Sequence, residues 1–202
     1  MISNSKNINT ITGFILAGGK SSRMGTDKGL IIFNEETIIQ QVIAQLKPVV
    51  NNLVIVSNNT TYEKFGLEVI GDIIKDIGPA GGIQSALNHS ETNYNFIVSC
   101  DMPFIKTNAI EFIIQQSFQS QITIPIFHQK AEPLFGVYTK KCLPKWTELI
   151  QLGIIKLTDI ASNFQLNKLN VDDNPLFSDV FFTNINTQND FNDALKISKN
   201  GN

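Results

Sequence analysis

The chain has 202 residues, of which 42% are hydrophobic, and its formal net charge is −2. The length suits one domain with one core, and the balanced charge excludes a broad basic surface, so we do not expect nucleic-acid binding. Residues 1–10 lack the apolar core of a signal peptide, and no segment is apolar over the roughly 18 residues of a membrane span, so we expect a cytoplasmic protein without membrane contact.

One α/β domain is expected at residues 11–197, between flexible ends at 1–10 and 198–202. Its first element is an apolar run at 11–16, which predicts a buried strand. The loop that follows this strand directly has the sequence LAGGKSSRMGTDK. A glycine-containing loop at the end of a buried strand is typical of a phosphate-binding site.

The composition of this loop supports that prediction. Gly18 and Gly19 can adopt backbone angles that turn successive N–H groups toward one anion. Arg23, the only arginine in the chain, offers a planar set of donors for phosphate oxygens, and Lys28 adds a mobile positive charge. Together these groups suit a polyphosphate.

Two common phosphate-binding loops do not match this sequence. Gly19-Lys20-Ser21 resembles the end of a Walker A motif, but that motif would need a glycine five residues before Gly19, where the chain has Phe14. A dinucleotide fingerprint needs the pattern Gly-x-Gly-x-x-Gly, whereas the glycines here lie at 18, 19 and 25. Both of these nucleotide-binding classes are therefore excluded.

The next elements alternate between helix and strand. Their apolar patterns predict a brief pairing at 30–33, a helix at 37–46 that Pro48 ends, and buried strands at 53–56 and 67–70. Polar residues follow both strands, among them Asn58 and Asp72. The ends of strands are thus the polar points of the predicted sheet.

A second glycine-rich segment, Gly78-Pro79-Ala80-Gly81-Gly82, precedes a helix predicted at 83–88. Backbone N–H groups at the start of a helix can bind a phosphate or a base, helped by the positive end of the helix dipole. A tight turn that binds no ligand explains the same residues. The phosphate-binding loop elsewhere in the chain favours the binding interpretation.

Asp101 follows a strand predicted at 95–100 and precedes Met102-Pro103. In open α/β sheets ligands bind beyond the carboxyl ends of the strands, and a carboxylate there can hold Mg²⁺ against phosphate oxygens. We therefore predict that Asp101 is a metal ligand. The alternative is that it only caps the turn before the proline.

Cysteine and histidine carry little chemistry in this sequence. The cysteines, Cys100 and Cys142, lack the paired spacing of zinc ligands, and Cys100 is expected to be a small buried residue. The histidines, His89 and His128, form no cluster. A histidine-based metal site or catalytic triad is therefore not expected.

The second half of the chain continues the alternation. We predict helices at 107–118, 146–152, 156–161 and 190–197, a strand at 122–126, a hairpin-like excursion that leads into an extended run at 133–138, and a strand that passes into a turn over 180–187. Thr187 is the predicted N-cap of the last helix. Asn184 and Asn186 lie just before it, either in the site or as residues that only satisfy the turn.

The pattern Leu-Ala-Gly-Gly-x-x-x-Arg-Met-Gly-x-Asp-Lys at residues 16–28 resembles the signature loop of the molybdenum cofactor guanylyltransferases, a branch of the nucleotidyltransferases. Cys-Asp-Met-Pro around Asp101 resembles the second motif of that family, in which the aspartate binds the ion that accompanies the nucleotide. Asn184-Ile185-Asn186-Thr187 resembles its Asn-x-Asn-Thr motif. The resemblance implies a three-layer, Rossmann-like α/β fold with a mostly parallel central sheet.

The resemblance also implies an activity, the transfer of GMP from GTP to the terminal phosphate of molybdopterin with Mg²⁺ as cofactor. The implied catalytic residues are Arg23, Lys28 and Asp101, with Asp101 as metal ligand. The implied nucleotide-binding residues are Leu16, Ala17, Gly18, Gly19, Lys28, Asn58, Asp72, Gly78, Pro79, Asp101, Asn184 and Asn186. The N-terminal half would bind the nucleotide and the C-terminal half the acceptor, with transient contacts to proteins of cofactor biosynthesis or molybdoenzyme maturation.

One departure from the family concerns the acceptor. The family often carries an arginine shortly after the glycine that corresponds to Gly153, where this chain has Ile154-Ile155-Lys156. Lys156 is the expected replacement as a phosphate contact, although an ammonium is less selective than a guanidinium. Two other functions stay open: a nucleotidyltransferase that uses CTP or another acceptor such as a sugar phosphate, and a nucleotide-binding module without catalysis.

Overall fold

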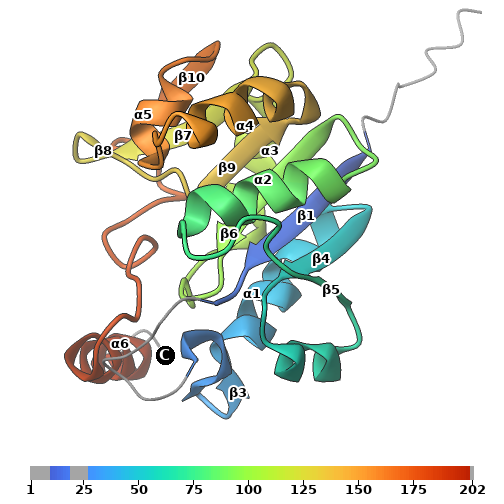
Figure 1. The fold of residues 1–202 in the computed structure, drawn as a ribbon. Helices are drawn as coiled ribbons and strands as arrows, with labels where there is room; N and C mark the ends of the chain where they lie inside the picture. The colour runs from blue at the N-terminus through green and yellow to red at the C-terminus, as the bar shows by residue number, and fades with distance from the viewer. Residues whose placement is uncertain (1–9, 19–26, 201–202) are drawn as a thin grey trace, which may run out of the picture.

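A computed structural model describes residues 10–18 and 27–200 (Figure 1). Within these ranges, eight strands form the central sheet in the order β10-β7-β9-β6-β1-β4-β5, with the short β8 paired to β7. Their bounds are β1 Ile11–Leu16, β4 Asn52–Val56, β5 Glu68–Ile70, β6 Tyr94–Ser99, β7 Ile122–Phe127, β8 Lys130–Ala131, β9 Phe135–Thr139 and β10 Leu166–Asn170.

Most of this sheet is parallel. β1 pairs in parallel with both β4 and β6, β5 runs parallel to β4, and β10 runs parallel to β7. β9 and the short β8 are the exceptions, because β9 pairs antiparallel with β6 on one side and with β7 on the other, and β8 pairs antiparallel with β7. The carboxyl ends of β1, β4, β5 and β6 therefore meet at one edge of the sheet, and the expected α/β fold with a mostly parallel sheet is confirmed.

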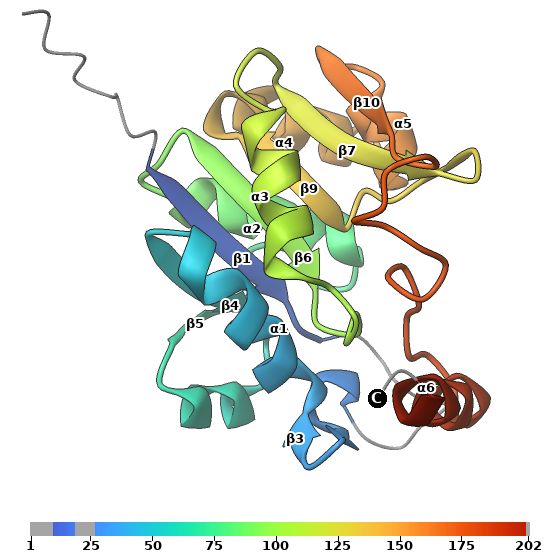
Figure 2. The ribbon, with the colours of Figure 1, turned by 180° about the vertical axis from the view of Figure 1, so that it is seen from behind.

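Helices cover both faces of the sheet and give three layers. α1 (Ile38–Leu46) and α3 (Thr107–Gln115) lie on one face, whereas α2 (Pro79–His89), α4 (Leu143–Gln151) and α5 (Leu157–Ala161) lie on the other (Figures 1 and 2). Side chains alternate between the faces of a strand, so Phe14 of β1 packs on the α2 and α4 side and Ile15 on the α1 and α3 side. Both are fully buried.

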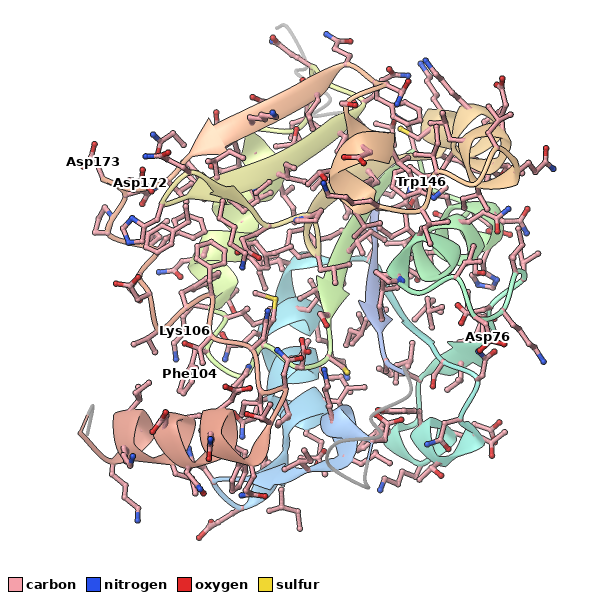
Figure 3. All side chains as sticks on the ribbon, turned by 60° about the vertical axis from the view of Figure 1, so that its left-hand side comes forward. Asp76, Phe104, Lys106, Trp146, Asp172 and Asp173 are labelled. Carbon is pink, nitrogen blue, oxygen red and sulfur yellow. The ribbon has the colours of Figure 1, made fainter. Side chains whose placement is uncertain are left out.

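The helix α6 (Gln188–Asn200) belongs to neither layer. It lies at one end of the molecule against a hairpin of β2 (Ile32–Phe33) and β3 (Glu36–Thr37) (Figures 1 and 2). Phe33 is central to this contact, since its ring centroid lies 6.1 Å from that of Phe191 in α6 and 5.6 Å from that of Phe104, which lies beside α6 (Figure 3). The end of the described chain thus packs on a segment near its beginning.

The structure corrects the predicted start of α2. This helix begins at Pro79 rather than Ile83, with Gly78 as its N-cap. Proline is well tolerated at the first helical position because its missing N–H would have no partner there. A Cβ on Gly81 would lie 2.7 Å from the Ile74 carbonyl oxygen, so this glycine lets α2 pack closely against the segment that precedes it.

Two further predictions are wrong. Residues 180–187 form turns rather than a strand, because Phe181 and Phe182 turn into an aromatic cluster with Phe135 and Phe177. α3 ends at Gln115, short of the predicted 118, and the hydroxyl of Ser117 donates to the Ile114 carbonyl 2.6 Å away. The strand β10 was not predicted at all. The remaining predicted elements are confirmed, with shifts at their ends.

Among the described residues, no helix is both long enough and apolar enough to cross a membrane.

Candidate active site

A cavity of about 940 Å³ opens where the carboxyl ends of the parallel strands meet. Parallel α/β sheets bind their ligands in this position because loops rather than strands continue the chain there. The described residues that the sequence assigned to catalysis and to the nucleotide all line this cavity: Leu16, Ala17, Gly18, Lys28, Asn58, Asp72, Gly78, Pro79, Asp101, Asn184 and Asn186. Gly19 and Arg23 lie outside the described residues.

Hydrogen bonds to Asp27 fix the backbone beside Lys28. Asp27 caps the 3-10 turn Lys28–Leu30 and accepts hydrogen bonds from the hydroxyl of Tyr62 and, at 3.4 Å, from the N–H of Gly29. A Cβ on Gly29 would lie 2.6 Å from the Tyr62 hydroxyl, so no larger residue fits. Burial, with the nearby Cys100 and Asp27, raises the pKa of Tyr62, which therefore keeps the proton that it donates.

The ammonium of Lys28 lies between two side chains from distant parts of the chain. It donates a hydrogen bond to the side-chain oxygen of Asn186 and lies 3.5 Å from Oδ2 of Asp101. Only 26% of the Lys28 side chain is exposed, so its charge is directed into the cavity rather than into bulk solvent. An anion entering the cavity would meet this charge.

Asp101 is an oriented and largely buried carboxylate. Only 9% of the residue is exposed, and the Ser99 hydroxyl donates to Oδ1 over 2.6 Å, which leaves Oδ2 beside Lys28. No group of three or more His, Cys, Asp or Glu side chains gathers as a metal site in the described part of the chain. A single carboxylate nevertheless fits Mg²⁺, which proteins commonly bind through one or two carboxylates together with substrate phosphates and water.

Asn58 and Asp72 form a reciprocal pair at the ends of β4 and β5. The Asn58 amide donates to Oδ2 of Asp72 over 2.9 Å, and the Asp72 N–H donates back to Oδ1 of Asn58 over 3.0 Å. Burial raises the pKa of Asp72, while the hydrogen bond from Asn58 opposes that shift. The pair presents fixed acceptors that suit the hydroxyl or N–H groups of a nucleoside.

The start of α2 lies on the same cavity. Gly78 has a φ of +67°, and among the described residues no atom beyond the adjacent chain lies within 4 Å of the Cβ that another residue would carry there. The space is therefore open, and the positive φ rather than crowding favours glycine at this position. Since Gly78 and Pro79 line the cavity, the positive end of α2 faces it.

The β7–β8 hairpin and the segment after it line the opposite wall. Its charged members are Lys130 and Glu132, whose Nζ and Oε1 lie 2.7 Å apart, and Pro133, Leu134 and Leu157 add apolar surface. Lys156, expected to contact the acceptor, does not line the cavity. Its ammonium lies 3.4 Å from Oδ1 of Asp159, and 74% of its side chain is exposed.

The asparagines before α6 complete the cavity. Asn184 has a buried Oδ1 to which no described residue donates a hydrogen bond, and Asn186 accepts from Lys28. Both residues line the cavity, whereas the turn itself is held by other groups. This placement favours the site interpretation of the two asparagines over the interpretation that they only satisfy a turn.

Comparison with known proteins assigns the chain to a family. The family model of the MobA-like NTP transferase domain matches residues 13–163, which include both walls of the cavity up to Leu157. The chain belongs to this family. It is accordingly a nucleotidyltransferase, and the resemblance found in its sequence motifs is confirmed.

Individual relatives of this MobA-like protein support the family assignment. A Flavobacterium johnsoniae protein named "Probable molybdenum cofactor guanylyltransferase" is 37% identical over 185 residues, which cover 91% of this chain and 96% of that protein. The "Molybdenum cofactor guanylyltransferase" of Vibrio parahaemolyticus is 36% identical over 178 residues, which cover 86% of this chain and 89% of the relative. Both likenesses extend over nearly the whole chain.

Solved structures support the MobA-like assignment. The crystal structure of molybdopterin-guanine dinucleotide biosynthesis protein A from Archaeoglobus fulgidus superposes with a TM-score of 0.80 at 25% sequence identity. The superposition covers 94% of this chain and 99% of that one. The likeness therefore extends to the arrangement of the whole domain.

The sequence motifs missed several residues that line the cavity of this MobA-like domain. Ser57, Asn59 and Ser99 lie beside the predicted residues at the ends of strands, and that position was the signal that could have found them. Lys130 and Glu132 lie in a short charged break between apolar runs, with no motif around them. They line the cavity only because the fold brings the β7–β8 hairpin to it.

Proposed function

We propose that this protein transfers GMP from GTP to the terminal phosphate of molybdopterin, releases pyrophosphate and forms the guanine dinucleotide cofactor. The observation that carries the proposal is the meeting of Lys28, Asp101 and Asn186 in one cavity. Its walls come from both halves of a chain that is 37% identical to a relative named as a guanylyltransferase. We assign the nucleotide to the N-terminal half and the acceptor to the C-terminal half.

The proposed reaction is one displacement at phosphorus. An oxygen of the acceptor phosphate forms a bond to the α-phosphorus of GTP, and the bond from that phosphorus to the oxygen bridging to the β-phosphate breaks. The electron pair leaves with pyrophosphate. Because the acceptor phosphate is already an anionic nucleophile, catalysis depends on alignment and on stabilising charge.

The proposed charge stabilisation comes from Lys28 and Arg23. Lys28 already lies in the cavity, 3.5 Å from Asp101, where its ammonium can approach the triphosphate. Arg23, outside the described residues, would add a guanidinium that binds phosphate oxygens in pairs. We propose Mg²⁺ as the cofactor and Asp101 as its protein ligand, where the ion would neutralise charge on the α-phosphate and the leaving group.

The remaining assignments follow the walls of the cavity. Asn58 and Asp72 would bind the nucleoside, since their acceptors are fixed by the reciprocal hydrogen bonds. Lys130 would contact the acceptor phosphate in place of Lys156, because Lys130 lines the cavity and Lys156 does not. The proposed phosphate and nucleotide contacts also include Leu16, Ala17, Gly18, Gly19, Gly78, Pro79, Asn184 and Asn186. A cytoplasmic location completes the proposal.

Pyrophosphate release tests this function directly. We expect release from GTP with Mg²⁺ when molybdopterin is present, and background rates with CTP, ATP or UTP or without the acceptor. Lys28→Ala serves as the inactive control. Preference for CTP would overturn the guanylyltransferase assignment in favour of a cytidylyl enzyme, and tight GTP binding without release under any condition would leave a binding module instead.

A further inference from the structure

α6 is fixed to the candidate active site at its first residues. Ile185, just before the helix, is fully buried, and its N–H donates to the backbone oxygen of Asp101 over 3.0 Å. On the helix itself, Phe191 packs against Phe33 of the β2–β3 hairpin. The segment between these two anchors carries Asn186, so the position of α6 determines where Asn186 lies.

Asp190 closes this segment with three hydrogen bonds. Its Oδ2 accepts from the N–H of Asn186 over 3.0 Å and from the N–H of Thr187 over 2.8 Å. In return, the N–H of Asp190 donates to the Thr187 hydroxyl oxygen over 3.2 Å. This reciprocal pattern is a capping box, which satisfies N–H groups at a helix start and fixes the entry of the chain into the helix.

The side chain of Asn186 then contacts the ammonium of Lys28, which lies 3.5 Å from Oδ2 of Asp101. Lysine has a long, flexible stem, so without partners its ammonium would sample many positions. Asn186 and Asp101 restrict it to one. The hydrogen bonds therefore form a continuous path from Asp190 through Asn186 to Lys28.

We infer that Asp190 is a positioning residue: by fixing the backbone of Asn186, it holds the Lys28 ammonium beside Asp101. Its effect on turnover rests on the proposed function, whereas its effect on Lys28 does not. Burial alone would raise the pKa of Asp190, but the hydrogen bonds from Asn186 and Thr187 and the charge of Lys28 lower it. The carboxylate is therefore charged at neutral pH, and charged acceptors form the stronger hydrogen bonds.

Chemical labelling of the unliganded protein tests the inference without any turnover. Acetic anhydride is added to wild type and Asp190→Ala, and acetylation at each lysine is followed by peptide mass spectrometry. We expect Lys28 to be labelled about three times faster in the variant, while Lys130, whose side chain is 71% exposed, keeps its rate. An unchanged rate at Lys28 overturns the inference, whatever reaction the protein catalyses.

Kinetics test the consequence for turnover. Asp190→Ala should lower kcat about tenfold with little change in the KM for GTP, because a displaced Lys28 loses transition-state contacts first. Asp190→Asn keeps an acceptor oxygen and should restore part of the loss. The matched control is Asp193→Ala on the same helix, where Oδ1 lies 2.8 Å from Lys196, and it should keep the wild-type kcat. A wild-type kcat in Asp190→Ala contradicts the inference.

A double variant separates positioning from simple support of the fold. If Asp190 acts through Asn186, then Asp190→Ala should lower kcat less than about twofold in an Asn186→Ala background, because residues in one network do not act additively. The fall in melting temperature should be similar in both backgrounds, since the helix cap is lost in each. An equal tenfold loss of kcat in both backgrounds would mean that Asp190 only supports the fold.

Discussion

The two walls of the cavity are built differently. On the wall proposed for the nucleotide, functional side chains follow strand ends and are fixed by hydrogen bonds to one another, a half-buried one from Ser99 to Asp101 and an exposed one from Asn58 to Asp72. On the wall proposed for the acceptor, the charges belong to a surface hairpin, and 71% of the Lys130 side chain is exposed. The first wall is organised before a ligand arrives, whereas the second can adjust to it.

This contrast predicts different kinetic effects of substitution. Interactions fixed in advance stabilise developing charge without reorganisation, so their loss lowers kcat. Interactions made by mobile side chains contribute mainly to binding, so their loss raises KM. Three sets of variants test the contrast, from the largest expected effect to the smallest.

Loss of Lys28 or Asp101 should be the most severe change. For Lys28→Ala and Asp101→Asn we expect kcat to fall about 10²–10³-fold, the size of effect seen when one group that stabilises transition-state charge is removed. The free energy of unfolding should fall by no more than about 1–3 kcal/mol, the cost of leaving a largely buried group without one of its partners. Pyrophosphate release and urea unfolding measure the two quantities.

Arg23→Ala should lower kcat to a similar extent. Lys196→Ala is the control for loss of a paired lysine, since Lys196 pairs with Asp193 on α6. If Lys28→Ala unfolds instead of losing turnover, the role of Lys28 is structural, and the wall proposed for the nucleotide does not act through it in catalysis.

Lys130 and Lys156 separate the two candidate contacts of the acceptor. Lys130→Ala should raise the KM for molybdopterin about tenfold, the equivalent of losing one charged hydrogen bond, and leave the KM for GTP unchanged. Lys156→Ala should have less than a twofold effect, because this side chain pairs with Asp159 outside the cavity. Steady-state kinetics with each substrate varied in turn measure both, and the reverse ranking would return the acceptor contact to Lys156.

Asp72→Asn should give the smallest effect, a rise of about threefold in the KM for GTP as a charged acceptor becomes neutral, because Asp72 is proposed to bind the nucleoside and not the charge that develops at phosphorus. Its stability is also informative. Because burial raises the pKa of Asp72, the folded state binds this proton more tightly than the unfolded state, and stability falls as pH rises through the folded pKa.

The variant should therefore be more stable than wild type at pH 7 and equal to it below about pH 4, the ordinary range of aspartate. Urea unfolding at both values measures this difference. A variant less stable than wild type at pH 7 would show that the Asn58 hydrogen bond, rather than burial, dominates.

Most of the fold could be predicted because its core elements carry strong periodic patterns. β1 and β6 are mostly apolar and each contains an unbroken run of three apolar residues, and α1 repeats apolar residues on one helical face. β10 could not be predicted because it lies at the edge of the sheet and its two leucines are three residues apart among Asn and Lys, which breaks the apolar alternation typical of a strand. The run near Phe181 was mistaken for a strand because aromatic packing in a turn and in a strand give the same composition.

In the candidate site, residues within local patterns could be predicted, whereas contacts between distant segments could not. Lys28 and Asp101 could be predicted because each lies at the end of a strong strand or in a recognisable motif. The contact between Lys28 and Asn186 could not, because it joins two distant segments through the position of α6. For the same reason the sequence indicated Lys156 as the acceptor contact and gave no sign of Lys130: a lysine near the expected position does not have to face the cavity.

The packing of α6 on the β2–β3 hairpin has a consequence for protein synthesis. The strands β1, β4 and β6, which carry the wall proposed for the nucleotide, are complete by Ser99, so they can begin to fold while the ribosome is still translating the second half. The second partner of Lys28, Asn186, arrives much later than Asp101, after a long loop of chain has been closed. A nascent chain that has folded its first half therefore has an incomplete cavity, and the cavity is completed only after α6 has been translated.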